Sequence, residues 1–314
     1  MSFSRPLPEA SEAAATAGLL ACPDCAAPLD GVAACGGCGR RFARQDGRPV
    51  LMPLRARALA FTLPTEGTNP AAIPADVLRY PARHGQPKGG TYHLDRAHED
   101  ILTALPKGAL VVETGCGGGQ MRAWATARGL RYLGTDVATT RVHDWLQAHG
   151  GPDVLCDAHA LPLRGGVADA VYAAAVWEHL AFPAAAAQEA ARVLRPGGWC
   201  IGSMSFLEPW HDESYAHMTP WGVYSTLRLG GLEPVAIWPE EGWSGFRAML
   251  EMGNKATRPL RPLAALMNAW YRAPKAAQHL WRTRRRATPQ DLIRPIATMA
   301  GAVAWIARKP QEAA

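Results

Sequence analysis

Short apolar runs alternate with stretches of helical periodicity through the middle of the chain. From His93 onward, the runs are typical of buried parallel strands and predict strands at residues 109–113, 132–135, 154–156, 170–175 and 199–203. Amphipathic stretches between them predict helices such as 121–128 and 184–194. This alternation predicts a doubly wound α/β sheet. We expect the sheet to be closed by a hairpin of two further runs, 234–238 and 246–251.

The flanking segments have different patterns. Residues 1–18 are rich in Ala, Ser and Pro, which predicts disorder, and prolines recur through 55–92 at a density typical of a linker or lid. Toward the C-terminus, the sequence from Arg258 onward predicts two or three helices broken near Pro274 and Pro289. In the last of these, apolar residues recur at helical spacing, namely Leu292, Ile293, Ile296, Met299, Val303 and Ile306. We therefore divide the chain into residues 1–18, a cysteine module at 19–54, a linker at 55–92, the α/β domain at 93–257 and a basic helical tail at 258–314.

Composition limits the class of protein. With 314 residues and 48% apolar content, the chain can bury one core of about 150 to 200 residues together with small satellites. No window approaches the roughly 18 uninterrupted apolar residues of a membrane span, and the start lacks the order of a secretory signal. We therefore expect a cytoplasmic protein.

The net charge of +6 is distributed unevenly. From Arg258 to the end, eleven Lys and Arg residues stand against Asp291 and Glu312. The basic character therefore belongs to the tail, and the rest of the chain is slightly acidic.

A glycine-rich turn follows the first predicted strand of the α/β domain. Residues 111–119 read VVETGCGGG, with Gly115, Gly117 and Gly119 at alternate positions. Glycines let the backbone turn sharply and approach a ligand closely. The next predicted strand ends in Asp136, whose carboxylate can accept hydrogen bonds from both hydroxyls of a ribose. On its own, the glycine pattern also fits a plain strand-to-helix turn.

Three further stretches follow in order, CDAHALPL (156–163), VADAVYAAAVWEHL (167–180) and RVLRPGGWCIGS (192–203). Together with the first two, they resemble the successive motifs of the class I S-adenosylmethionine-dependent methyltransferases, in particular the small-molecule enzymes with a seven-stranded Rossmann-like sheet. The resemblance covers about residues 93–251. A nicotinamide-dependent reductase would require glycine at position 120, where this chain has Gln.

The resemblance implies a set of contacts with S-adenosylmethionine. Its methionine part is expected over the turn that contains Gly115, Cys116, Gly117 and Gly119. The ribose is expected at Asp136 and the adenine at Val137, Asp157 and Ala158, and Glu113 is expected to anchor the turn or a water molecule. Asp157 can alternatively be a helix N-cap. Thr114 departs from the family, in which an apolar residue is common, and we expect little effect.

Methyl transfer to a hydroxyl requires a base, for which histidine is well matched near neutral pH. Candidates follow the fifth strand in a segment that resembles the acceptor-side insertion of one branch of the family, and they are His211, Asp212, Tyr215 and His217. His179, which follows Glu178 after the fourth strand, is expected at the cofactor edge of the pocket. Four tryptophans can line an aromatic acceptor site or serve as packing, namely Trp177, Trp210, Trp238 and Trp243.

The cysteine module contains two Cys-x-x-Cys pairs separated by nine residues, Cys22 with Cys25 and Cys35 with Cys38. This spacing predicts a tetrahedral structural Zn²⁺ site with no open position. The residues that follow, 41–53, resemble the end of the zinc-ribbon proteins that activate methyltransferases.

We predict a methyltransferase whose acceptor is a small molecule, a sugar or a lipid-linked compound methylated on oxygen. An RNA base methyltransferase and a non-catalytic, cofactor-binding activator remain as alternatives. The basic tail fits packing on the catalytic domain, peripheral contact with an anionic membrane surface, or attraction to nucleic acid. The sequence does not indicate the oligomeric state.

Overall fold

In the computed structural model, the described residues are 18–31, 33–54, 60–64, 69–87, 93–139, 149–253 and 255–311. The predicted N-terminal disorder therefore lies outside the described residues, apart from Gly18. Much of the predicted linker or lid also lies outside them, at 55–59, 65–68 and 88–92.

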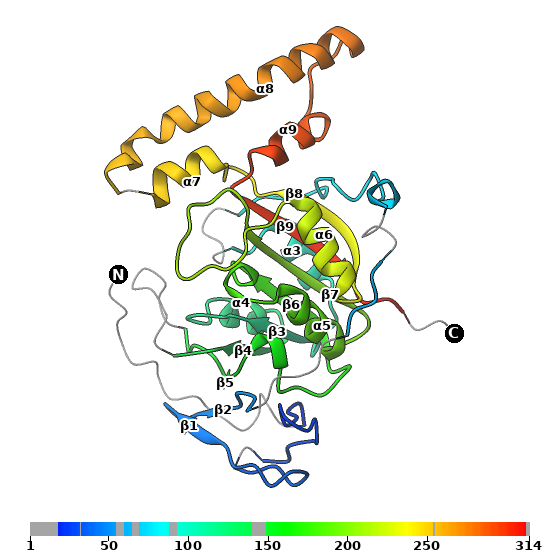
Figure 1. Ribbon diagram of the computed structural model, residues 1–314, viewed down its shortest axis with the longest axis vertical. Helices are drawn as coiled ribbons and strands as arrows, with labels where there is room; N and C mark the ends of the chain where they lie inside the picture. Colours follow the sequence, from blue (N-terminus) through cyan, green and yellow to red (C-terminus); the bar gives the residue numbers. More distant parts are fainter. Residues whose placement is uncertain are drawn as a thin grey trace.

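One mixed sheet of nine strands organises the molecule, in the order β1-β2-β5-β4-β3-β6-β7-β9-β8 (Figure 1). Its core is the predicted seven-stranded unit, formed by β3 (Leu110–Thr114), β4 (Arg131–Asp136), β5 (Val154–Leu155), β6 (Ala168–Ala174), β7 (Leu194–Ser205), β8 (Glu233–Pro239) and β9 (Ala302–Arg308). The five strands β5, β4, β3, β6 and β7 run parallel to one another, whereas β9 runs antiparallel to both β7 and β8. The predicted α/β fold class is confirmed.

Helices cover both faces of this sheet because alternate side chains of each buried strand point to opposite faces. Val111 belongs to a hydrophobic cluster on one face, together with residues of α3 (Arg96–Thr103), α4 (Met121–Ala127) and α9 (Ile293–Thr298). Its neighbours Leu110 and Val112 belong to a second hydrophobic cluster on the opposite face, together with residues of α5 (Pro183–Val193) and α6 (Pro220–Leu229). Short 3₁₀ turns connect some of these elements, at Pro70–Ala72, Ala158–Ala160 and Trp177–His179.

The last strand of the sheet corrects two predictions. Residues 246–251, expected as a strand, belong to helix α7 (Gly245–Met252), whose N-terminus is capped by the Ser244 side chain. Residues 302–308, expected in the helical tail, form β9. The apolar run of β9 fits either element locally. Pairing with β7 and β8, far away in sequence, decides for the strand.

Helix α8 (Arg261–Thr283) corrects a third prediction, because it continues through Pro274. A proline inside a helix removes one backbone hydrogen bond but does not always end the helix. Two 3₁₀ segments flank α8, at Lys255–Leu260 and Gln290–Leu292. No helix in the described part of the chain has the length and apolar character to cross a membrane.

The cysteine module is joined to one edge of the sheet, at the end of the molecule opposite α7 and α8 (Figure 1). Its hairpin consists of β1 (Ala43–Gln45) and β2 (Arg48–Val50), and β2 pairs with β5. The Leu51 N–H donates to the Leu155 carbonyl at 2.8 Å. Leu19, Leu20 and Leu51 belong to the main hydrophobic core, so the module shares its stabilising contacts with the sheet.

Candidate functional site

The glycine turn after β3 has a backbone that other residues rarely adopt. Gly115, Gly117 and Gly119 have φ angles of +64°, +52° and +76°. A Cβ on Gly115 would lie 2.5 Å from the side chain of Val176, and one on Gly119 would lie 3.0 Å from the Gly151 carbonyl. A Cβ on Gly117 would meet nothing within 4 Å. The turn is thus fixed by tight packing at its ends and leaves open space at its middle.

Asp136, at the end of β4, connects this turn to the neighbouring strand. Its Oδ2 accepts a hydrogen bond from the Gly117 N–H at 2.8 Å, and its Oδ1 accepts one from the Val137 N–H at 2.7 Å. Val137 is exposed. The carboxylate is therefore held at the strand end next to the glycine turn, where the sequence predicts a ribose contact.

Glu113, the last but one residue of β3, is paired with the Tyr132 hydroxyl, which donates to its Oε2. Burial raises the pKa of Glu113 to about 8, although the Tyr132 hydrogen bond opposes this shift. At neutral pH the side chain is mostly protonated and retains an acidic hydrogen that it can donate.

Asp157 caps the short helical turn that begins at Ala158. Its Oδ1 accepts from the His159 N–H at 2.8 Å and lies 2.6 Å from the ring atom Nδ1 of His159. The hydrogen bond from the His159 side chain is the main reason why the pKa of Asp157 is lowered. The N-cap alternative for Asp157 is therefore present in the structure.

A cavity of about 680 Å³ opens beside the glycine turn. Of the residues assigned to cofactor or acceptor, it is lined by Glu113, Gly115, Cys116, Gly117, Glu178, His179, His211, Asp212 and Trp243. The remaining candidates do not line it: Gly119, Asp136, Val137, Asp157, Ala158, His217 and Tyr215. The structure thus brings the middle of the glycine turn and two of the three candidate histidines to one cavity.

The three candidate histidines form a chain of adjacent rings. The ring centres of His179 and His211 are 5.5 Å apart, and those of His211 and His217 are 5.7 Å apart. His217 lies behind His211, and its Nε2 is 3.0 Å from the Ser214 hydroxyl. Burial, followed by the neighbouring His211, lowers the pKa of His217, so its imidazole is neutral at pH 7.

The four tryptophans separate into different environments. Trp177 and Trp238 are buried in the core and Trp210 is exposed. Trp243 lines the cavity, and its indole N–H donates to Glu208. Of these four tryptophans, only Trp243 therefore contacts the cavity beside the glycine turn.

Several carboxylates line the cavity without having been predicted from the sequence, among them Asp95, Glu208 and Glu240. Burial raises the pKa of Glu240 to about 7. Glu208 belongs to the segment LEPWH, so its position next to His211 was an available signal. Asp95 and Glu240 come from distant parts of the chain and could not be grouped with the site before folding.

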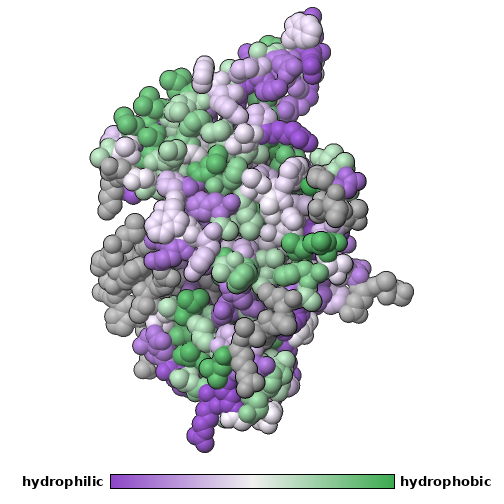
Figure 2. All heavy atoms as spheres, viewed as in Figure 1, coloured by the Kyte–Doolittle hydropathy of each residue, from purple (hydrophilic) through white to green (hydrophobic). Residues whose placement is uncertain are grey.

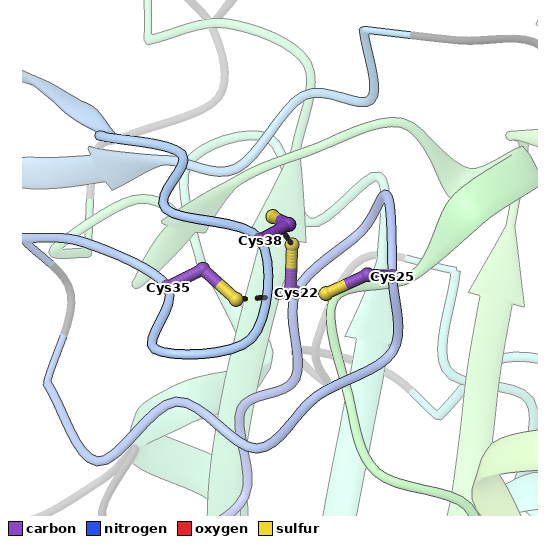
Figure 3. Close-up of side chains that lie close together, drawn as sticks. All are labelled: Cys22, Cys25, Cys35 and Cys38. Carbon is purple, nitrogen blue, oxygen red and sulfur yellow. Dashed lines mark hydrogen bonds between the residues drawn. The ribbon is translucent and has the colours of Figure 1, made fainter.

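The four cysteines of the N-terminal module converge on one point (Figure 3). The Sγ atoms are 3.8 Å apart for Cys22 and Cys38 and 3.5 Å apart for Cys25 and Cys35, and all four lie within 4.8 Å of one another. Four thiolates on one Zn²⁺, with bonds of about 2.3 Å, are separated by about 3.8 Å. The residues therefore fit a four-thiolate zinc site.

Comparison with known proteins identifies methyltransferases. A family model described as a methyltransferase domain matches residues 112–202. The Mus musculus tRNA (carboxymethyluridine(34)-5-O)-methyltransferase ALKBH8 is 37% identical over 105 residues, which are 32% of this chain and 15% of that protein. An uncharacterised methyltransferase of Mycobacterium sp. (strain KMS) is 32% identical over 116 residues. The match covers 36% of this chain and 46% of that protein.

Solved structures give a more distant likeness. Haemonchus contortus phosphoethanolamine N-methyltransferase 2, in complex with S-adenosyl-L-methionine, aligns with a TM-score of 0.41 and 18% identity. The alignment covers 69% of this chain and 52% of that chain.

Proposed function

This chain carries a class I S-adenosylmethionine-dependent methyltransferase domain, and we propose that it transfers the methyl group to an oxygen atom of a small or lipid-linked acceptor. The observation that carries the proposal is the shared cavity. Residues of the glycine turn and the side chains of His179 and His211 line the same space, so a methyl donor and a proton acceptor can meet there.

The turn fits the cofactor chemically. Gly117 leaves the room that a side chain would occupy, and the mostly protonated Glu113 offers a hydrogen-bond donor without a full negative charge. When bound, S-adenosylmethionine supplies an electrophilic methyl group on a sulfonium. The role of the protein is then to orient the acceptor and to exclude water.

Removal of the acceptor's proton is assigned to the cluster formed by Glu178, His179 and His211. Histidine is matched to proton transfer near neutral pH. The mouse relative is by name an O-methyltransferase, which agrees with an oxygen acceptor here.

An RNA acceptor is the second candidate, because the mouse relative is by name a tRNA methyltransferase. The acidic lining of the cavity disfavours an RNA acceptor. The cavity lining includes Glu208, Glu240, Glu241 and Glu251 with only two arginines, Arg247 and Arg258. Carboxylates repel phosphates, and nucleic-acid binding depends on cationic contacts to the phosphate backbone.

A lipid-linked acceptor is favoured by the surface of α8. Trp270 and Trp281 are 78% and 70% exposed, and further apolar side chains are exposed on the same helix, namely Leu263, Leu266 and Met267. The helix has no acidic residue. Figure 2 shows apolar atoms gathered over α7 and the adjoining part of α8, with hydrophilic atoms at the far end of α8. Exposed aromatic and basic residues on one helix are typical of contact with an anionic lipid surface.

A labelled-methyl assay tests the acceptor class. The full chain is incubated with S-adenosylmethionine carrying a labelled methyl group and with the soluble, lipid and RNA fractions of a lysate. We expect label in the lipid or soluble fraction, in a product that is stable to ribonuclease. Label that is released by ribonuclease would replace this proposal with RNA methylation.

The membrane contact is tested separately by sedimentation with vesicles. We expect binding to vesicles that contain phosphatidylglycerol and much weaker binding to pure phosphatidylcholine. Replacing both Leu266 and Trp270 by Ser should reduce the bound fraction. Equal binding of the variant and the parent chain would remove α8 from the membrane contact.

For the cysteine cluster we propose one structural Zn²⁺ per chain, held by Cys22, Cys25, Cys35 and Cys38. The sulfur separations support this proposal. Four thiolates complete the tetrahedral coordination of a structural Zn²⁺ and leave no position open for a catalytic water. The metal would stabilise the module rather than take part in the chemistry.

A further inference from the structure

Three potential metal ligands meet on the side of the cavity that is lined by His179 and His211. One carboxylate oxygen of Glu178 and one ring nitrogen each of His179 and His211 lie within 4.8 Å of one another. Ligands on one ion with bonds of about 2.1 Å are about 3.4 Å apart in tetrahedral geometry. Small side-chain rotations can close that difference.

Glu178 has an oxygen that nothing in the described part of the chain satisfies. The residue is 1% exposed and lines the cavity. Its Oε1 is hydrogen-bonded to the Ser205 hydroxyl at 2.9 Å, but its Oε2 has no hydrogen-bond partner among the described residues. A buried polar atom without a partner is destabilising, so this oxygen indicates a missing ligand.

His211 is held in the tautomer that a metal ligand requires. Its Nδ1 lies 2.8 Å from the Pro209 carbonyl, which can only accept, so Nδ1 carries the hydrogen. The lone pair is therefore on Nε2, the atom on the side of Glu208. Histidine ligands commonly donate their other ring N–H to a backbone carbonyl in this way.

The backbone around these ligands is strained and tightly fixed. Ala175 has a φ angle of +55°, and Asp212 has one of +41°. The Tyr215 N–H donates to the Glu178 carbonyl at 2.6 Å, which ties the loop of His211 to the turn of Glu178. Non-glycine residues in the left-handed region concentrate where function over-determines the backbone.

The charge around the cluster favours a cation. The Oε2 of Glu208 lies 3.7 Å from the Nε2 of His211, and the same Oε2 accepts a hydrogen bond from the Ser205 hydroxyl at 2.5 Å. Ser205 has one hydrogen and contacts both Glu178 and Glu208. Two carboxylates so close to one hydroxyl are better accommodated when a proton or a metal ion neutralises one of them.

We propose that Glu178, His179 and His211 form a binding site for a divalent transition-metal ion, which takes the acceptor oxygen as a further ligand. Two imidazoles and one carboxylate suit such ions and leave coordination positions open. This inference rests on the proposed methyl transfer to oxygen and specifies how the cluster assists it.

The metal-bound hydroxyl would be a stronger acid than the free one. With both imidazoles on the metal, the histidines would not themselves accept the proton, and the cluster would assist its removal through the metal. The acceptor O–H bond would break, and its proton would pass to the Glu208 carboxylate. The O–CH₃ bond forms as the bond between the methyl carbon and the sulfonium sulfur breaks, which leaves a neutral thioether. No oxidant or reductant is required, because no atom changes its redox state.

Binding of Mn²⁺ to the full chain tests the site directly. Mn²⁺ is chosen because four thiolates favour Zn²⁺ over this harder ion. In a titration followed by electron paramagnetic resonance, we expect one Mn²⁺ bound per chain. Glu178→Gln and His211→Ala should each weaken binding at least tenfold. His279→Gln, a histidine on α8 outside the cluster, is the matched control and should bind Mn²⁺ like the parent chain.

A measurement on the parent chain alone guards against variants that do not fold. Because the glycine turn and the cluster line one cavity, bound Mn²⁺ should broaden the methyl proton signal of bound S-adenosylmethionine. Absence of broadening, absence of Mn²⁺ binding, or unchanged binding by Glu178→Gln would each overturn the site.

The outcomes separate this inference from the proposed function. Methyl transfer to an oxygen acceptor without Mn²⁺ binding would leave the function intact and reject the metal site. Mn²⁺ binding in the cavity with methylation of nitrogen or RNA instead would retain the site and reject the proposed acceptor.

Discussion

Arg48 joins the cysteine module to the segment beside the glycine turn, and its replacement tests that connection. Its side chain is fully buried. Its guanidinium donates to the Pro152 carbonyl at 2.7 Å, the Gly150 carbonyl at 2.6 Å and the Asp46 carbonyl at 2.8 Å. The segment that it holds contacts the glycine turn, because the Gly151 N–H donates to the Gly118 carbonyl at 3.0 Å.

The replacement Arg48→Met keeps most of the volume and removes all three donors. The bond to the Pro152 carbonyl is buried, and a buried carbonyl left without a donor costs about 1 to 3 kcal/mol. The bonds to the Gly150 and Asp46 carbonyls are part-buried, and the loss of each costs about 1 kcal/mol. Two of the three carbonyls belong to the distant segment 150–152. We therefore expect the free energy of unfolding to fall by about 3 to 5 kcal/mol.

Denaturant unfolding measures the change in stability, and calorimetry with S-adenosylmethionine measures the change in cofactor affinity. Arg44→Met, an exposed arginine in the same hairpin, is the matched control and should change stability by less than about 0.5 kcal/mol. We expect Arg48→Met to weaken cofactor binding about tenfold. A stability change no larger than that of the control would refute the energetic reasoning. An unchanged cofactor affinity in a destabilised variant would refute the link to the turn.

Three further predictions concern the ribose contact of Asp136, the zinc site and the protonation of Glu113. Asp136→Ala should weaken S-adenosylmethionine binding by about 10- to 100-fold, the equivalent of one or two charge-assisted hydrogen bonds; an unchanged calorimetric affinity would contradict the ribose contact. Elemental analysis of the freshly purified chain should find one zinc, and Cys38→Ala should lose it; a metal-free parent chain would remove the zinc proposal. Because burial raises the pKa of Glu113 to about 8, the folded state binds more protons than the unfolded state above the ordinary pKa of Glu, and stability should fall as the pH rises toward 8. Glu113→Gln should reduce that fall between pH 5 and pH 8, and an identical pH dependence would show that Glu113 is charged when folded.

The chemistry of individual segments was readable before folding. The glycine turn is encoded locally, because alternate glycines permit the positive φ angles at Gly115, Gly117 and Gly119. The two cysteine pairs encode their knuckles in the same way. The methyltransferase resemblance predicted a seven-stranded sheet and the residues expected to contact the cofactor, and the seven-stranded core confirms the fold class.

The side of the cavity lined by His179 and His211 could be predicted only in part from the sequence. The sequence identified His179, His211 and His217 as candidates, but it could not place His217 behind His211 or bring Glu240 beside them. Those relations depend on where β7, β8 and the loop after β7 end in space. They are set by pairings between residues far apart in the chain.

The sequence by itself determined the parallel strands, the glycine turn and the cysteine spacing, because each depends on periodicity or backbone freedom within a few residues. Tertiary structure decided that residues 302–308 are a strand and that Arg48 connects the cysteine module to the segment beside the glycine turn. An apolar run such as that of β9 is compatible with helix or strand until long-range partners supply its hydrogen bonds. Local propensity is worth a fraction of a kcal/mol per residue, and burial and pairing in the sheet outweigh it.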